Sequence, residues 1–125
     1  MKYFVVVCAL LVLVSAVSLG QVWKKGDFVA SVNSEAWTLS EGKGERIHKY
    51  IVNFDKAYAN PPSVVVMLNG FDASNDDTEG TKKNAATRLA LVTEQVTKGG
   101  FVIKVKTWGD SKLNAVWGSW VAYGK

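Results

Sequence analysis

The last quarter of the chain carries the pattern that most constrains the fold. From Phe101 to Gly124 apolar and polar residues alternate, a turn signal follows at Gly109-Asp110, and a second strand pattern begins. Alternation with a period of two is typical of β-strands, whose successive side chains point to opposite faces. The segment therefore predicts a β-hairpin. Three of the five tryptophans of the chain fall in it, so their rings either fill a core or form a platform for a ligand.

The register of the first strand separates a core face from a solvent face. Its apolar residues alternate with lysines, which predicts that the apolar set points inward. The inward set is Phe101, Ile103 and Val105, and the outward set includes Lys104 and Lys106. By the same count Trp108 leaves the core register at the end of the strand, just before the turn. We therefore interpret Trp108 as a candidate ligand platform.

The two tryptophans of the second strand point to opposite faces. Trp120 lies between Gly118 and Ala122, and small residues beside a large ring favour tight packing. We assign Trp120 to the core. The sequence leaves Trp117 open between core and surface.

The remaining chain also has β character. Ile47–Phe54 alternates, with Tyr50, Val52 and Phe54 on one face. Ser63–Leu68 is a β-branched run that predicts a strand buried on both faces, and Asn69-Gly70 predicts a turn after it. Further strands are expected within 22–32 and 88–96, although the composition of 88–96 would also permit a helix. About six short strands separated by turns indicate a single-domain, all-β antiparallel sandwich or barrel. Residues 72–87 are predicted to form a long polar loop, which is either functional or a tolerated insertion.

Residues 1–20 have the pattern of a secretory signal peptide. A short basic start precedes an apolar run from Phe4 to Val14, and Ser18 and Gly20 supply small residues for cleavage. We expect a secreted, extracellular domain over 21–125, with an uncleaved N-terminal anchor as the alternative. The only cysteine, Cys8, lies in the signal, so stability must come from packing or from an oligomer instead of disulfides. No second apolar stretch follows, so no membrane insertion is expected.

Charge and motifs exclude several classes of function. The formal net charge is +4, and the basic residues are scattered, which argues against nucleic-acid binding. His48 is the only histidine, so we expect no zinc site within one subunit and no other metal or cofactor. The acidic residues of the 72–87 loop match no standard calcium-binding spacing. No nucleophile or phosphate-loop motif is present, so an enzyme is not expected.

Arg88 is a candidate partner for the Trp108 platform. It begins a strand directly after the long loop. A guanidinium group is a rigid set of five donors that can hold two hydroxyl oxygens at once. Carbohydrate recognition combines such a group with an aromatic ring that stacks on the C–H face of a sugar. The alternative role for Arg88 is a surface salt bridge.

At these residues the chain resembles the H-type lectin domain family, over the run from Ile51 to Tyr123. The shared pattern comprises Val52-x-Phe54, Pro61-Pro62, the VVVML strand, Phe71-Asp72, Arg88, Gly100-Phe101, Thr107-Trp108 and Ser119-Trp120-Val121-Ala122. The resemblance implies a six-stranded antiparallel β-sandwich that assembles as a homotrimer or as stacked trimers forming a hexamer. It also implies binding of N-acetylgalactosamine or galactose between neighbouring subunits, with Arg88 on sugar hydroxyls and Trp108 near the acetamido group.

Several positions depart from the family pattern. Gly109 replaces a histidine that can bind a metal on the trimer axis, so no axial zinc is expected. Asn114 replaces a tyrosine contributed by the neighbouring subunit. Glu41 and Glu45 are the candidates for the acidic sugar ligand, although a gapless count places Lys43 there. Asp110, in the same turn as Gly109, completes the candidate carbohydrate site.

The leading hypothesis is a secreted, non-enzymatic lectin that binds glycans multivalently, in agglutination or innate recognition. A second hypothesis is a charge-driven binder of anionic surfaces or sulfated glycans. It rests on Lys24, Lys25, Lys82, Lys83, Lys104 and Lys106. A third is a structural secreted protein that kept the sandwich and lost the sugar site.

Overall fold

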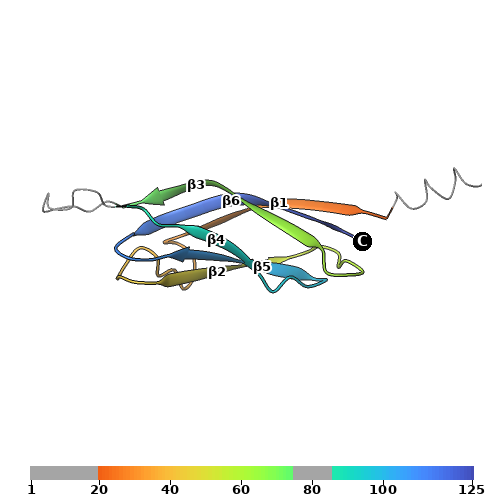
Figure 1. Ribbon diagram of the computed structural model, residues 1–125, viewed down its shortest axis with the longest axis horizontal. Helices are drawn as coiled ribbons and strands as arrows, with labels where there is room; N and C mark the ends of the chain where they lie inside the picture. The colour runs from red at the N-terminus through yellow and green to blue at the C-terminus, as the bar shows by residue number, and fades with distance from the viewer. Residues whose placement is uncertain (1–19, 75–85) are drawn as a thin grey trace, which may run out of the picture.

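The computed structural model describes residues 20–74 and 86–125, and within these residues six strands form two packed three-stranded sheets (Figure 1). One sheet has the order β1-β6-β3 and the other β2-β5-β4, and every pairing is antiparallel. The expected six-stranded antiparallel β-sandwich is therefore confirmed. The strands are β1 (Val22–Ser31), β2 (Arg46–Asn53), β3 (Ser63–Ala73), β4 (Ala90–Glu94), β5 (Gly100–Thr107) and β6 (Leu113–Gly124).

The C-terminal segment is not a hairpin within one sheet. β5 is the central strand of one sheet and β6 is the central strand of the other, so the connection between Thr107 and Leu113 crosses from sheet to sheet. The prediction of two paired strands was wrong because alternation shows which face a residue occupies and does not identify the partner strand. β5 and β6 therefore each pair with one strand on either side.

The core lies between the two central strands. The predicted inward set of β5 is buried, with Ile103 and Val105 fully covered and Phe101 2% exposed. The Trp120 ring makes an edge-to-face contact with Phe101, with ring centroids 5.4 Å apart. At 9% exposure Trp120 is a core residue, which confirms its assignment. Aromatic pairs of this geometry add to the free energy gained from burial alone.

Two glycines accommodate the two tryptophans of β6. A Cβ atom added at Gly26 of β1 would lie 2.7 Å from Cε2 of Trp120, inside the sandwich. A Cβ atom added at Gly70 of β3 would lie 2.5 Å from Cζ2 of Trp117, which is 38% exposed on the outer face. Each indole thus lies across a neighbouring strand at a position without a side chain. Trp117, left open by the sequence, belongs to the surface.

β3 departs from its prediction in two ways. It is an edge strand and not a strand buried on both faces, because Val65 and Met67 are 49% and 42% exposed. The strand also continues through Asn69-Gly70, where a turn was predicted, with a register shift between Leu68 and Gly70. A β-bulge absorbs an extra residue without ending the strand, so a turn signal in the sequence can mark a bulge.

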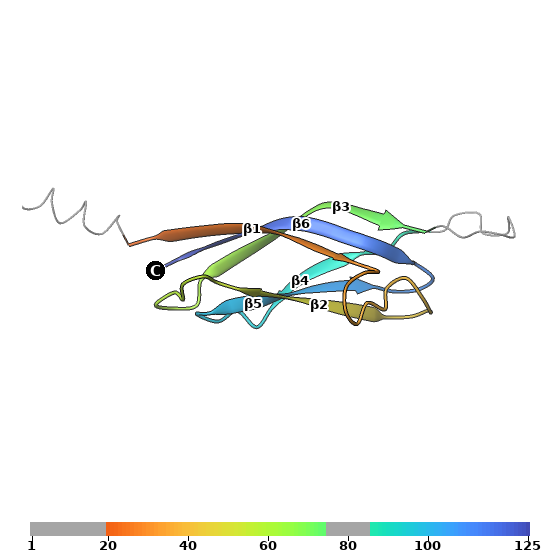
Figure 2. The same cartoon turned by 180° about the vertical axis from the view of Figure 1, so that it is seen from behind.

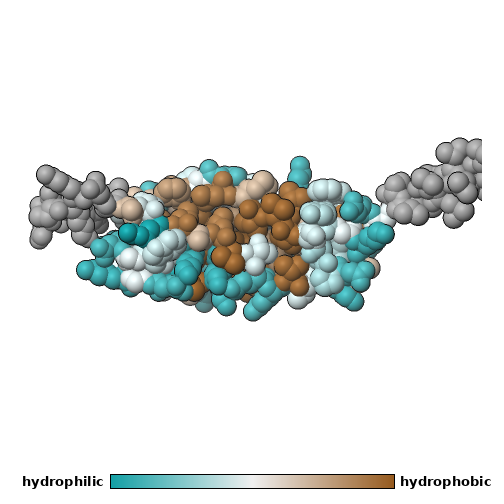
Figure 3. All heavy atoms as spheres, in the orientation of Figure 1, coloured by the Kyte–Doolittle hydropathy of each residue, from teal (hydrophilic) through white to brown (hydrophobic). Residues whose placement is uncertain are grey.

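The edge strands β3 and β4 expose apolar side chains. Figure 3 shows hydrophobic residues gathered in the middle of one face, over these two strands. We call this set the apolar edge; it comprises Val65, Met67, Leu68, Phe71 and Val92, each 39–49% exposed. Contiguous exposed apolar residues of this kind mark interaction surfaces.

Two predictions fall largely outside the described residues. The signal peptide covers residues 1–20, of which 1–19 are not described, and most of the 72–87 loop lies in the undescribed stretch 75–85. Among residues 20–74 and 86–125 no helix is long and apolar enough to cross a membrane.

Removing the Trp120 ring is predicted to cost far more stability than removing the Trp117 ring. Trp120→Ala should lower the free energy of unfolding by about 3–5 kcal/mol, because it empties a filled core site. Trp117→Ala, on the same strand, should cost about 1 kcal/mol or less, as is usual for surface positions. Chemical denaturation monitored by far-UV circular dichroism measures both. Equal losses would contradict the placement of the two rings.

The ion pair between Lys104 and Glu94 predicts a pH dependence. The hydrogen bond from Lys104 lowers the pKa of Glu94 below its ordinary value of 4.5. The pair therefore stabilises the fold above pH 4.5, and this contribution is lost as the pH falls through the lower folded-state pKa. An NMR titration of the Glu94 carboxyl carbon should show a higher pKa in Lys104→Met than in the wild type. The same midpoint in both proteins would rule the interaction out.

Candidate functional site

Two connections meet at one end of the sandwich. The β1–β2 connection runs beside the β5–β6 connection there, as Figure 2 shows from behind. Their backbones are bonded directly: the Gly44 N–H donates to the Gly109 carbonyl at 2.9 Å, and the Leu113 N–H donates to the Leu39 carbonyl at 2.8 Å. Fold topology thus brings the predicted residues of 41–45 close to those of 108–110.

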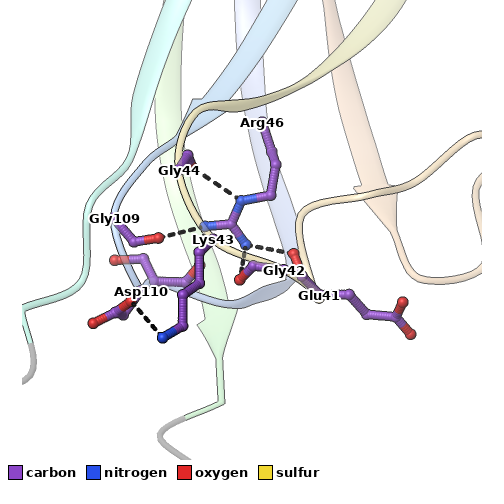
Figure 4. Close-up of polar contacts among 8 residues, drawn as sticks. Glu41, Gly42, Lys43, Gly44, Arg46, Gly109 and Asp110 are labelled. Atoms are coloured by element: carbon purple, nitrogen blue, oxygen red, sulfur yellow. Dashed lines mark hydrogen bonds and ion pairs between the residues drawn. The ribbon is translucent and has the colours of Figure 1, made fainter.

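Arg46, at the start of β2, holds the two connections together (Figure 4). Its guanidinium group donates to backbone carbonyls on both sides. The acceptors are Gly44 (3.0 Å), Glu41 (2.6 Å), Gly42 (3.2 Å), Gly109 (3.1 Å) and Ser111 (2.8 Å). Because all five donors of a guanidinium lie in one plane, a single side chain can fix both backbones at once.

Sequence reasoning missed Arg46. The sequence signal for it is the pair of glycines just before it, Gly42 and Gly44. In the structure both adopt positive φ angles, of 73° and 80°. Alternating glycines in the left-handed region curl the backbone so that successive carbonyls face one centre. An arginine directly after such a segment is placed to bind those carbonyls.

The main chain of Arg88 is fixed by two hydroxyl groups. The Arg88 N–H donates to Oγ of Ser111 at 2.8 Å, and the Ser111 hydroxyl donates in turn to the Ala86 carbonyl at 2.9 Å. On the other side, the Thr107 hydroxyl donates to the Arg88 carbonyl at 2.6 Å. Arg88 is therefore tied to the residues immediately before and after the β5–β6 turn.

The Arg88 side chain lies against this turn. A Cβ atom added at Gly109 would be 3.0 Å from Nη1 of Arg88, and Gly109 has a φ angle of 66°. Both observations explain the glycine: the left-handed backbone favours it, and a side chain would meet the guanidinium. The adjacent Trp108 is 39% exposed, as its register predicted. The structure therefore brings Arg88, Trp108 and Gly109 together within one protomer.

The acidic candidates take different positions. Asp110 lies 4.0 Å from Lys43, and Glu45 pairs with Lys106 at 2.8 Å. The Glu41 side chain points away from Arg46 and Asp110 (Figure 4), so only its backbone carbonyl takes part in this cluster. Asp110 thus lies in the turn itself, and Glu45 is paired with a residue of β5 just before it.

Asn114 and His48 lie at the same end but in different settings. Asn114 is the second residue of β6, and its backbone carbonyl accepts a hydrogen bond from the Val32 N–H at 2.9 Å. His48 is buried at 7% exposure and packs on Trp37, with ring centroids 5.1 Å apart. In the described ranges 20–74 and 86–125, no group of acidic, histidine or cysteine side chains could hold a metal ion.

The arrangement provides what a polar, ring-shaped ligand needs. Arg88 supplies donors, Asp110 and Glu45 supply acceptors, and Trp108 supplies an exposed aromatic surface. An antiparallel β-sandwich with these donors, acceptors and aromatic surface at one end is typical of the class of carbohydrate-binding β-sandwich domains. Residues 50–123 match the H-type lectin domain, and the chain belongs to this family.

One relative is similar over most of its own length. The protein named ATP synthase subunits region ORF 7 of Fuscovulum blasticum is 32% identical over 90 residues, which is 72% of this chain and 69% of that protein.

Two solved structures share the fold. Wild-type discoidin II from Dictyostelium discoideum has a TM-score of 0.69 at 21% identity, over 85% of this chain. The present chain spans only 37% of the discoidin II chain. The tailspike gp61 of Pseudomonas phage phi297 has a TM-score of 0.52 at 11% identity and is covered over 16% of its length. At these identities the likeness concerns the fold alone.

Loss of the Arg46 guanidinium is predicted to loosen the whole end of the sandwich. Arg46→Ala should lower the free energy of unfolding by about 1–3 kcal/mol, because several carbonyls lose a charged donor. The Gly44 amide should exchange faster with solvent in a hydrogen-exchange experiment. Lys106→Ala is the matched control, since it removes only the partly exposed pair with Glu45 and should cost about 0–1 kcal/mol. Unchanged exchange at Gly44 in Arg46→Ala would refute the role of Arg46.

Proposed function

We propose that this chain is a non-enzymatic lectin that binds N-acetylgalactosamine- or galactose-type glycans at the Arg88–Trp108 end of the sandwich. The observation that carries the proposal is the close approach of the Arg88 guanidinium to Gly109, the residue that directly follows the exposed Trp108. The family assignment supports carbohydrate binding over catalysis.

Each residue has a defined role in this proposal. The Arg88 guanidinium bonds two sugar hydroxyls, and its fixed main chain limits the entropy lost on binding. The Trp108 ring contacts the C–H face and the acetamido group of the sugar. Asp110 or Glu45 accepts a further hydroxyl. Asn114, from a neighbouring subunit, closes the site where the family has a tyrosine.

We propose further that the chain assembles as a homotrimer or hexamer. Within the apolar edge, Leu68, Phe71 and Val92 support a subunit interface, because these apolar side chains are exposed on two edge strands and do not share the face of Trp117. β4 follows Arg88 in the chain, so an interface at this edge brings a second subunit towards the sugar site. Each site then binds with about 4–8 kcal/mol, the millimolar to micromolar range. Several sites in one assembly raise the apparent affinity for arrayed glycans.

The proposed biological setting is extracellular. A secreted, multivalent lectin would agglutinate cells or recognise microbial surfaces, as in innate immunity. The support is the secretory pattern of residues 1–20 together with the family assignment.

The sugar site is tested by a glycan array with three variants. Arg88→Ala and Trp108→Ala should each lower binding to galactose-type glycans at least tenfold, because each removes a direct contact of about 1.4 kcal/mol or more. Lys98→Ala, an exposed charge removed at the opposite end of β5, is the control and should bind as the wild type does. If Arg88→Ala and Trp108→Ala both bind as the wild type does, the assignment of the sugar site is wrong.

A salt titration separates this proposal from the charge-driven alternative. Lys24 and Lys104, two residues on which that alternative rests, are paired with Asp55 and Glu94, which leaves fewer unpaired lysines for an anionic ligand. Sugar binding by stacking and hydrogen bonds should change little between 50 and 500 mM salt, roughly the range over which screening removes surface attraction. A steep loss of binding across this range would favour an anionic ligand.

A further inference from the structure

The outer face of the β1-β6-β3 sheet carries a second exposed aromatic platform. Trp117 lies across Gly70, whose missing side chain lets the indole rest against the neighbouring strand. The ring is nevertheless 38% exposed, on the face opposite the core. This is the packing that buries Trp120 over Gly26, but here it holds a large aromatic ring against the sheet where water can reach it. This site does not involve Arg88 or Trp108.

A row of polar side chains crosses the sheet beside Trp117. The Asn69 amide donates to Oγ of Ser119 at 2.8 Å, and the Ser119 hydroxyl donates to Oδ1 of Asp27 at 2.9 Å. These residues come from all three strands of the sheet. Ser119 is two residues from Trp117 on the same face of β6, a distance of about 7 Å along the strand. The Asp27 carboxylate, on an exposed residue, accepts hydrogen bonds and is oriented by Ser119.

A second aromatic group stands on the other side of this row. Trp23 and Tyr123 stack with ring centroids 4.9 Å apart and an interplanar angle of 22°, and Trp23 is 64% exposed. Tyr123 is six residues from Trp117 along β6, which places the two aromatic groups about 20 Å apart. The face is therefore a long surface with rings towards both ends and hydrogen-bonding groups between them, and it also exposes Val29, opposite Trp117, and Val65 and Met67 of β3.

The polar row and the charged side chains of this face favour a sugar chain over a protein partner. A dry protein interface would bury the Asp27 carboxylate and the nearby Lys25 without new partners, at a high cost in desolvation. A glycan offers hydroxyls to such groups and C–H faces to the rings. Because the charges of Asp27 and Lys25 are opposite in sign, this pair favours a neutral ligand. We propose that the outer face of β1-β6-β3 is a second carbohydrate-binding surface, for extended neutral oligosaccharides.

The test uses the full chain carrying Arg88→Ala, so that binding at the Arg88–Trp108 end does not contribute. Chitohexaose, cellohexaose and a β-galactan hexasaccharide are titrated into ¹⁵N-labelled protein. At least one should shift the indole Nε1–H signal of Trp117 and the side-chain amide of Asn69. Adding Trp117→Ala should weaken the affinity at least tenfold. Asp27→Ala, which removes only an exposed carboxylate, should weaken it about threefold or more.

Three results would overturn the proposal. The first is that none of the three hexasaccharides shifts the Trp117 and Asn69 signals. The second is an affinity in Asp27→Ala and Trp117→Ala equal to that of the parent protein. The third is a Trp117 signal that changes with protein concentration in the absence of sugar, which would show that a second copy covers this face. Loss of glycan-array binding by Arg88→Ala bears on the proposed function alone, so the two proposals fail separately.

Discussion

The hydrogen bonds of the Arg46 guanidinium hold in place the end of the sandwich on which the proposed function depends. β5 and β6 are the centres of different sheets, so the chain must cross between the sheets in the few residues after Thr107. Arg46 bonds the carbonyls of Gly109 and Ser111 in this crossing and three carbonyls of the opposing connection. The crossing in turn positions Trp108 and receives the Arg88 side chain at Gly109. The partly buried Arg46 side chain therefore organises a site in which it has no direct role.

Glycine positions decide which tryptophans are structural and which are available. Gly26 lets Trp120 pack inside the sandwich, Gly70 lets Trp117 lie on the outer face, and Gly109 leaves room for Arg88. In each case a missing Cβ atom allows a large side chain to approach the backbone closely. A glycine at the point of contact is thus used in the core, on the proposed second surface and at the proposed sugar site. The aromatic richness of the C-terminal segment divides into these separate roles.

Alternation in the sequence predicted the strands and their inward faces well. It identified Ile103 and Val105 as core, Trp108 as surface and the all-β class, because period-two patterns follow directly from strand geometry. It did not identify strand partners, so β5 and β6 were predicted as a hairpin and β3 as a strand buried on both faces. Asn69-Gly70 was read as a turn because a β-bulge and a turn use the same residue types.

The candidate site was predictable only in part, for a similar reason. Arg88 and Trp108 were identified from residue chemistry and family resemblance, and the structure brings them to one turn. Arg46 was not identified because its acceptors Gly109 and Ser111 are 63 and 65 residues away in the chain. The direction of the Glu41 side chain likewise depends on how the two connections meet. Contacts of this range arise from topology, which local patterns do not encode.

A crystal structure of the assembled protein with N-acetylgalactosamine tests the central claim most directly. The account predicts the sugar at the β5–β6 turn, with hydroxyl oxygens within hydrogen-bond distance of the Arg88 guanidinium and its C–H face or acetamido group on the Trp108 ring. It also predicts a neighbouring subunit within contact distance of that sugar. Sugar bound away from Arg88 and Trp108, or none bound at saturating concentration, would contradict the account.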